Sequence, residues 1–264
     1  MKGNIIMKKF ELTTESIEKF GRKLFRIRAL INFGNVKAGD LGGYLEKESN
    51  LSHDGSAWVY DNACVFGNAH VFGNACVFEN AEVYDSAKVF GDAEVRGCVQ
   101  VRGYAKVFEN AYVSERACVS GNARVYENVC VADNASVSGN ALVSGHALVS
   151  GNVQVIEHTV VSGDVVVSGN AQVTGNAFVS GDVQILNDAL IKSKDDYIFF
   201  KGFGSENRST TMFRLKNNEI FVKCGCFHGT LQEFEDKVKE THNGNKYAKE
   251  YLACVEAAKI HFGI

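Results

Sequence analysis

The middle of the chain repeats every six residues. An aliphatic side chain occupies each sixth position from Val59 to Ile191, which makes 23 six-residue units, and V-F-G-N-A-H at 65–70 is a typical one. Four positions after the aliphatic residue, nearly every unit carries alanine or another small or β-branched residue. Two inward positions in every six fit neither a helix nor simple strand alternation. The spacing therefore predicts short strands joined by tight corners.

The corners fit a closed, three-sided coil. The typical unit places Gly-Asn after the outward residue, and these residue types accept the positive φ of a tight corner. Three units then make a coil of 18 residues with valine and alanine inside. Since coils stack at the spacing of strands, the repeats predict nearly eight coils and a column of roughly 37 Å at ~4.8 Å per coil. We expect a mainly β protein, a parallel β-solenoid in which residues 18 apart lie above one another.

The two flanks do not repeat, and we expect them to cap the open ends of the solenoid, whose unpaired strand edges would otherwise promote aggregation. An N-terminal cap spans residues 1–56, with a strand-like alternation at 22–33. The solenoid spans 57–194. Residues 195–264 predict a small α/β domain with strands at 197–203, 210–215 and 219–224, a helix capped by Thr230 and Glu233, and an amphipathic helix at 245–262.

Composition indicates a cytosolic protein that is not embedded in a membrane. Hydrophobic residues make up 45% and charged residues 22% of the chain, and no apolar stretch approaches the ~20 residues that span a bilayer. The N-terminus has too short an apolar run for a signal peptide. A net charge of −3 gives no overall attraction to nucleic acid, so such binding would need a local basic patch.

The eight cysteines are expected to be free thiols. Cys64 and Cys118 stand three coils apart, as do Cys76 and Cys130, and ~14 Å is too far for a disulfide. Cys224-Gly225-Cys226 with His228 lacks a second ligand pair at a zinc-like spacing, so we expect strand-end packing there and no metal site.

Outward positions 18 apart form columns, and two columns on one face stand out. The aromatic column comprises Phe72, Phe90, Phe108 and Tyr126. The basic column beside it comprises His70, Lys88, Lys106 and Arg124, and then turns apolar at Leu142, Val160 and Phe178. Such a face could mediate self-association, bind a macromolecular partner, or stack a nucleotide or single-stranded nucleic acid.

The repeat resembles the left-handed β-helix of the hexapeptide-repeat superfamily over about half the chain, and this resemblance alone implies the handedness. Proteins of this superfamily are commonly trimers, so a homo-oligomer, trimer or dimer, is implied. Many are acyltransferases that use a histidine base and an acyl-CoA donor. The resemblance thus makes acyl transfer from acetyl-CoA the alternative function.

His146 and Asp164 are the candidates for such catalysis, because they lie one coil apart on a corner as a possible base and its orienting carboxylate. That corner column is polar throughout, however, and no loop leaves the repeats between Val59 and Ile191 to wall a donor site. We therefore assign no catalytic residue and no cofactor, and favour a non-enzymatic protein.

Both flanks carry a further resemblance. Residues 26–63, RIRALINFGNVKAGDLGGYLEKESNLSHDGSAWVYDNA, resemble hexapeptide-repeat proteins of bacteria and their phages that are labelled transferases by fold alone, and residues 224–253 resemble a module at the ends of phage-borne repeat proteins. This implies a phage or prophage origin. We expect a phage-associated binding or scaffold protein in the host cytosol that presents a rigid surface to a host protein, such as a defence component that it blocks. Sequestration of nucleotides or nucleic acid is the third alternative.

Overall fold

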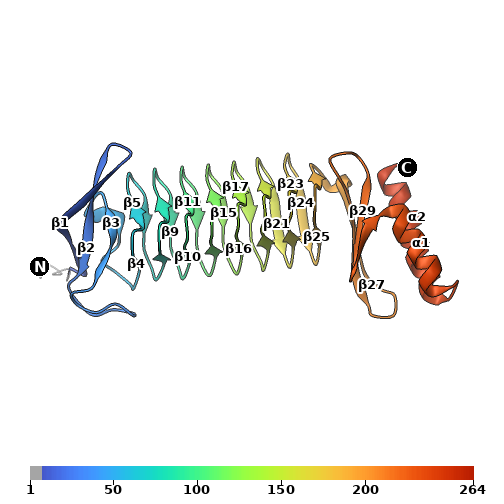
Figure 1. The fold of residues 1–264 in the computed structure, drawn as a ribbon, viewed down its shortest axis with the longest axis horizontal. Helices are drawn as coiled ribbons and strands as arrows, with labels where there is room; N and C mark the ends of the chain where they lie inside the picture. The colour runs from blue at the N-terminus through green and yellow to red at the C-terminus, as the bar shows by residue number, and fades with distance from the viewer. Residues whose placement is uncertain (1–7) are drawn as a thin grey trace, which may run out of the picture.

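The computed structural model describes residues 8–264, so the apolar run at 5–7 that is too short for a signal peptide lies outside the described residues. The molecule is a straight column with a cap at each end, and the two ends of the chain lie at opposite ends of the column (Figure 1). The predicted parallel β-solenoid of nearly eight coils is confirmed, as is the mainly β class.

Three parallel sheets form the sides of the column, and we name each face by its first strand. The β5 face contains β5 (Cys64–Val65), β8 (Glu82–Val83), β11 (Gln100–Val101), β14 (Cys118–Val119), β17 (Ser136–Val137), β20 (Gln154–Val155), β23 (Gln172–Val173) and β26 (Leu190–Ile191). The β4 face contains β4 (Trp58–Val59), β7 (Cys76–Val77), β10 (Glu94–Val95), β13 (Tyr112–Val113), β16 (Cys130–Val131), β19 (Leu148–Val149), β22 (Val166–Val167) and β25 (Gln184–Ile185). The β6 face contains β6 (His70–Val71), β9 (Lys88–Val89), β12 (Lys106–Val107), β15 (Arg124–Val125), β18 (Leu142–Val143), β21 (Val160–Gly163) and β24 (Phe178–Gly181).

The interior is built from the two inward positions of each unit. The aliphatic residues from Val59 to Ile191 are fully buried, and the alanine positions between them are buried as well. Strands pair 18 residues apart, as in Val89 with Val107 and Val107 with Val125, so identical side chains stack along the column. Burying one valine side chain contributes roughly 1.5–3 kcal/mol, and the stack repeats this contribution in every unit.

The corners differ from the expectation in one respect. Glycine takes positive φ as predicted, but acidic residues take the same conformation at other corners, among them Glu109 (φ 59°) and Asp133 (φ 59°). Their carboxylates accept the backbone N–H of the corner one coil on, at 3.0 Å for Glu109 and 2.8 Å for Asp133. Asparagine, which follows the positive-φ residue, instead forms side-chain ladders such as Asn134–Asn152 at 3.0 Å. These hydrogen bonds offset the strain of the left-handed corner.

The N-terminal cap extends the β5 face. Strands β1 (Phe10–Lys19), β2 (Arg22–Ala29) and β3 (Leu41–Leu45) continue its sheet to 11 strands, with β3 parallel to β5. β2 matches the expected strand but ends at Ala29, and the sequence pattern did not indicate β1. A 3₁₀ turn, η1 (Glu48–Asn50), follows.

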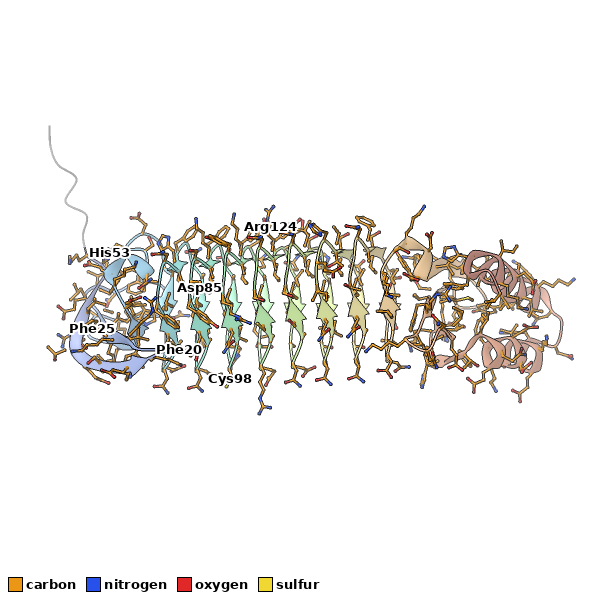
Figure 2. The ribbon with its side chains drawn as sticks, turned by 90° about the horizontal axis from the view of Figure 1, so that it is seen from above. Phe20, Phe25, His53, Asp85, Cys98 and Arg124 are labelled. Carbon is orange, nitrogen blue, oxygen red and sulfur yellow. The ribbon has the colours of Figure 1, made fainter. Side chains whose placement is uncertain are left out.

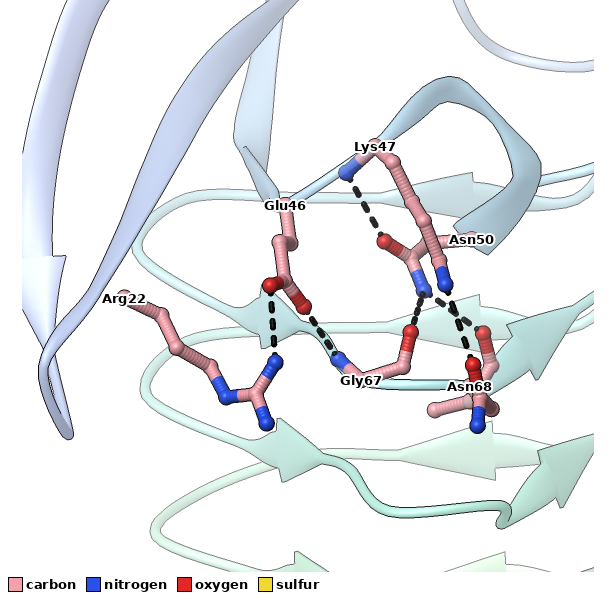
Figure 3. A network of polar contacts seen from close by, with 7 residues as sticks. Arg22, Glu46, Lys47, Asn50, Gly67 and Asn68 are labelled. Atoms are coloured by element: carbon pink, nitrogen blue, oxygen red, sulfur yellow. Dashed lines mark hydrogen bonds and ion pairs between the residues drawn. The ribbon is translucent and has the colours of Figure 1, made fainter.

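Side chains of the cap complete the hydrogen bonding of the first coil (Figure 3). The Asn50 amide, which is fully buried, donates to the carbonyls of Gly67 (3.2 Å) and Ala69 (2.8 Å). Glu46 accepts the Gly67 N–H at 2.6 Å and is held by Arg22 at 2.7 Å. The cap thus takes the place of a preceding coil, whose backbone would have met these groups.

A buried lysine satisfies two further carbonyls at this end of the column. Lys9 is 1% exposed, and its ammonium donates to the carbonyl oxygens of Gly55 (3.3 Å) and Ala57 (2.9 Å). Its charge also lies 4.9 Å from the ring centre of Phe33. Burial lowers the pKa of Lys9 to about 8, against the smaller opposing effect of Asp54.

The C-terminal module caps the other end. The 3₁₀ turn η2 (Lys194–Asp196) leads to an antiparallel sheet of β27 (Tyr197–Phe203), β28 (Arg208–Arg214), β29 (Ile220–Cys224) and β30 (Phe227–Thr230), followed by helices α1 (Leu231–His242) and α2 (Lys246–Phe262). The capping box of Thr230 and Glu233 is confirmed. β30 was not foreseen, and β28 begins two residues earlier than expected.

The sheet of this module has two buried faces. Tyr197, Phe199 and Phe213 pack against the solenoid core, whereas Ile198, Phe200 and Met212 pack in a second core with the helices. Acceptors meet the N–H groups of the last coil: Thr211 Oγ1 accepts from Gln184, and Asp196 from Lys192. Within residues 8–264, neither helix has the length and apolar character needed to cross a membrane.

All eight cysteines are free thiols, as expected. Cys64 and Cys118 lie in one column, separated by Glu82 and Gln100 on the intervening coils. The expected three-coil separation, which is too large for a disulfide, is therefore present in the structure.

We predict that Lys9 makes the stability of the cap dependent on pH. The folded-state pKa of about 8 lies below the ordinary 10.5, so between these values the unfolded chain binds more protons, and stability rises with pH. Relative to Lys9→Met, the wild type should gain up to about 3 kcal/mol over this window. Urea unfolding of both proteins at pH 7.5 and 10.5 measures the difference in their free energies of unfolding. The contributions of other titrating groups cancel in this difference. An unchanged or falling difference would contradict the assignment.

The solenoid core also contains one hydroxyl that is expected to lower its stability. Thr159 occupies an alanine position, is fully buried, and its Oγ1 has no hydrogen-bond partner among the described residues. Thr159→Val replaces the hydroxyl by a methyl group of similar size and should raise the free energy of unfolding by about 1 kcal/mol. Thermal or urea unfolding tests this, with the outward Thr174→Val as control. A less stable Thr159→Val protein would show that the hydroxyl contributes to the fold.

Candidate functional site

The structure brings the four predicted aromatic residues together on the β6 face. Phe72, Phe90, Phe108 and Tyr126 stack in order, with ring centroids 4.7, 4.8 and 4.9 Å apart and ring planes within 3°. They occupy the same position of successive coils, so the stacking distance is the coil spacing itself. The aromatic column is therefore a continuous ladder.

Self-stacking leaves little ring face for a ligand. Phe90 and Phe108 each have both faces covered by neighbouring rings, and Phe108 is only 9% exposed. The Arg124 guanidinium lies 5.6 Å from the ring centre of Phe108 and 5.7 Å from that of Tyr126. A nucleic acid base stacks on the face of an aromatic ring. Because neighbouring rings cover these faces, the ladder presents mainly ring edges to a base. The geometry gives no support to base stacking along this column.

The predicted basic column lies directly beside the ladder. His70 pairs with Lys88, Lys88 with Lys106, and Lys106 with Arg124, in the register of adjacent strands. Lys88, Lys106 and Arg124 are exposed, and Arg124 projects from the edge of the column in Figure 2. None of the ion pairs found within residues 8–264 includes any of these three cations. Like charges in directly opposed strand positions destabilise a sheet.

His70 differs from the other members of the basic column. Its ring stacks on Phe72 at 4.9 Å. Burial, and then the charge of Lys88, lowers the pKa of His70 below its usual value. The neutral imidazole is therefore favoured, and the ring extends the aromatic ladder at its N-terminal end. The positive charge of the column comes from the two lysines and the arginine.

The same column becomes apolar over the next three coils. Leu142 pairs with Arg124, followed in register by Val160 and Phe178, which is 52% exposed. Between Arg124 and Lys192 the sequence contains no lysine or arginine. We call the column His70, Lys88, Lys106, Arg124, Leu142, Val160 and Phe178 the docking strip. Its first half is cationic and its second half is apolar.

The candidate catalytic pair lies in an exposed corner ladder. His146 Nδ1 is 3.5 Å from Asp164 Oδ1, and Asn128 Nδ2 is 3.2 Å from His146 Nε2. The side chains of His146 and Asp164 are 69% and 72% exposed. His158 makes the equivalent contact with Asn140 at 3.1 Å. Both histidines thus replace asparagine in ladders of the corners, an arrangement that does not exclude water as acyl transfer requires.

Cys224-Gly225-Cys226 forms the turn of the hairpin between β29 and β30, with Cys224 paired to Phe227. The Thr210 hydroxyl donates to Cys224 Sγ at 3.1 Å. In the part of the chain that the structure describes, no three His, Cys, Asp or Glu side chains group in a way that could hold a metal ion. The turn geometry accounts for this motif.

The fold and these columns define a class of protein: a capped parallel β-solenoid with one charged and aromatic face. Comparison with known proteins takes the identification no further, because no family model matches the chain and a search of curated proteins finds no match.

We predict that the aromatic ladder contributes to stability as a stack. Phe90→Ala removes two stacked pairs and should cost about 2 kcal/mol, since each pair contributes ~0.5–1.5 kcal/mol beyond the apolar area that it buries. Ser162→Ala, at the same outward position of a later coil, should change stability by less than about 0.5 kcal/mol. Urea unfolding measures both. Equal effects would show that the rings do not act as a ladder.

Proposed function

We propose that the chain is a non-enzymatic binding solenoid whose docking strip holds an acidic protein partner. The observation that carries this proposal is the row of Lys88, Lys106 and Arg124, exposed on consecutive coils and without an ion-pair partner among residues 8–264. Aligned like charges lower the stability of the isolated sheet. A negatively charged partner would offset this repulsion and gain affinity from it.

The apolar half of the docking strip complements the basic half. Leu142, Val160 and Phe178 supply apolar surface that is released from water on binding, whereas the cations steer the encounter and set the orientation. The backbone of every coil is hydrogen-bonded to the next coil, so the backbone loses little conformational entropy on binding. The partner that fits is a folded protein or peptide with an acidic patch next to an apolar patch.

An acidic protein is favoured over nucleic acid by two features. The rings of the ladder cover one another, so bases would meet only ring edges. The cationic row also ends after Arg124, whereas a nucleic acid backbone would be met best by a longer basic track. Phosphate contacts alone would remain, and these are one outcome of the experiment below.

The biological setting completes the proposal. The six-residue spacing and the solenoid support membership of the hexapeptide-repeat superfamily, and the resemblance to that superfamily implies a left-handed coil. The resemblance of residues 26–63 and 224–253 to phage-borne proteins supports a phage or prophage origin and action in the host cytosol. In that setting the partner is a host defence protein that the solenoid blocks. A homo-oligomer, trimer or dimer, would present several docking strips at once.

Site-specific photocrosslinking tests the choice of face. A photoreactive residue is placed at Leu142 on the β6 face or, as a matched control, at Leu148 on the β4 face, both half-buried outward positions of two-residue strands. We expect the Leu142 probe, and not the Leu148 probe, to crosslink in bacterial lysate to a protein segment rich in Asp and Glu, identified by mass spectrometry. Equal crosslinking from both positions, or adducts that nuclease removes, would reject this partner.

Charge reversal tests the role of the cations. Lys88→Glu with Lys106→Glu should weaken the captured complex at least 100-fold, because two attractive pairs become repulsive. Arg102→Glu with Arg116→Glu makes the same change in net charge at exposed positions outside the docking strip and should leave affinity within about twofold. Raising salt should weaken the wild-type complex and not the charge-reversed one. Turnover of acetyl-CoA with a defined acceptor would instead establish the acyltransferase alternative.

A further inference from the structure

The C-terminal module contains a pocket that plays no part in the docking strip. It opens between the β29–β30 turn and helices α1 and α2 and has a volume of about 180 Å³. Buried side chains form its floor: Cys224 from β29, Phe234 and Val238 from α1, and Tyr251 from α2. The pocket therefore lies over the second hydrophobic core, at the far side of the module from the solenoid.

Aromatic rings shape the floor. Phe234 lies edge-on to Tyr251 with ring centroids 5.7 Å apart, and Phe227 is tilted against Phe234 at 5.2 Å. His242 stands 5.7 Å from Tyr251. Burial, and then the neighbouring Cys224, raises the pKa of Tyr251 to about 12, so its hydroxyl stays neutral. The floor is thus apolar and uncharged, with ring edges and faces that suit a flat or branched apolar group.

The rim of the pocket is basic. Arg208, Lys237 and His242 line it, and no carboxylate does. Lys237 is paired with Glu240 at 2.8 Å, whereas Arg208 takes part in none of the ion pairs found among the described residues. The carbonyls of Lys239 and His242 at the end of α1 accept the N–H groups of Asn243 and Asn245, which keeps these oxygens occupied. Of the arginine and the lysine on the rim, Arg208 is thus the one without an ion-pair partner among the described residues.

The hairpin turn leaves room for the exposed Arg208 side chain. Gly225 has φ +55°, and a β-carbon at this position would come within 2.5 Å of Arg208 Nη1 and 2.7 Å of its Cδ. The absence of a side chain at Gly225 therefore lets the arginine lie across the turn at the mouth of the pocket.

We propose that this pocket binds a carboxylate attached to a small apolar group, with Arg208 pairing with the carboxylate and the aromatic floor holding the apolar group. Guanidinium and carboxylate match as a bidentate pair. The volume of about 180 Å³ lies below the ~300–1,000 Å³ of pockets for larger ligands, which favours a small acid over a nucleotide. A free organic acid and the C-terminal residue of a peptide share this chemistry.

Titration with defined probes tests the proposal on the full chain. The probes are 3-phenylpropionate, its neutral amide, and a pentapeptide ending in phenylalanine with a free or an amidated C-terminus. We expect 3-phenylpropionate, or the peptide with a free C-terminus, to bind with a dissociation constant in the millimolar range or below. Calorimetry and NMR shifts of the Tyr251 and His242 rings measure this binding. Arg208→Gln should weaken this binding at least 10-fold, while the exposed Lys249→Gln on α2 should leave it unchanged.

The outcomes separate clearly. Binding of the small acid but not the peptide identifies a free acid as the ligand, and tighter binding of the free peptide identifies a protein C-terminus. Absence of binding at 10 mM, equal binding of the neutral amides, or equal binding by the Arg208→Gln protein overturns the proposal. An unchanged unfolding midpoint of Arg208→Gln shows that loss of binding is not loss of fold. The result is independent of the docking strip, since Lys88→Glu should bind the same probes.

Discussion

The structure depends on a hydrogen-bonded register of 18 residues. Each coil donates backbone N–H groups to the carbonyls of the next, as Lys88 N does to Ala105 O (2.9 Å) and Phe90 N to Val107 O (3.0 Å). This register places equivalent residues above one another at the spacing of strands. Valine stacks, asparagine ladders, corner carboxylates and the Phe72–Tyr126 ring ladder all follow from it. The cationic row follows from the register as well, because basic residues 18 positions apart lie directly above one another on the same face.

The register also gives the column a polarity that its caps match. The first coil presents carbonyl oxygens, and the N-terminal cap meets them with donors, the Asn50 amide and the Lys9 ammonium. The last coil presents N–H groups, and the C-terminal module meets them with acceptors, Thr211 Oγ1 and the Asp196 carboxylate. Unpaired backbone groups at either end would be costly and open to association. The two caps therefore differ in the backbone groups that they mainly satisfy, although Glu46 also accepts the Gly67 N–H and Lys216 N also donates to the Asp188 carbonyl.

Periodicity explains how much of the molecule could be predicted. The solenoid, its inward residues and the two columns of the β6 face follow from spacing alone, because one position of the repeat fixes all others. The caps have no period, so β1 and β30 were missed. The carboxylates at positive φ, such as Glu109, could have been noticed, since acidic residues recur where glycine is the rule. The pocket at Arg208 depends on side-chain placement between elements that have no period, which spacing does not encode.

The contacts between successive coils are equivalent, so the length of the column can change by whole coils. Adding or deleting 18 residues would leave both caps with the same neighbours and would change the distance between them by one strand spacing, ~4.8 Å. The separation between the docking strip and the carboxy-terminal pocket is therefore adjustable in fixed increments, without any redesign of either.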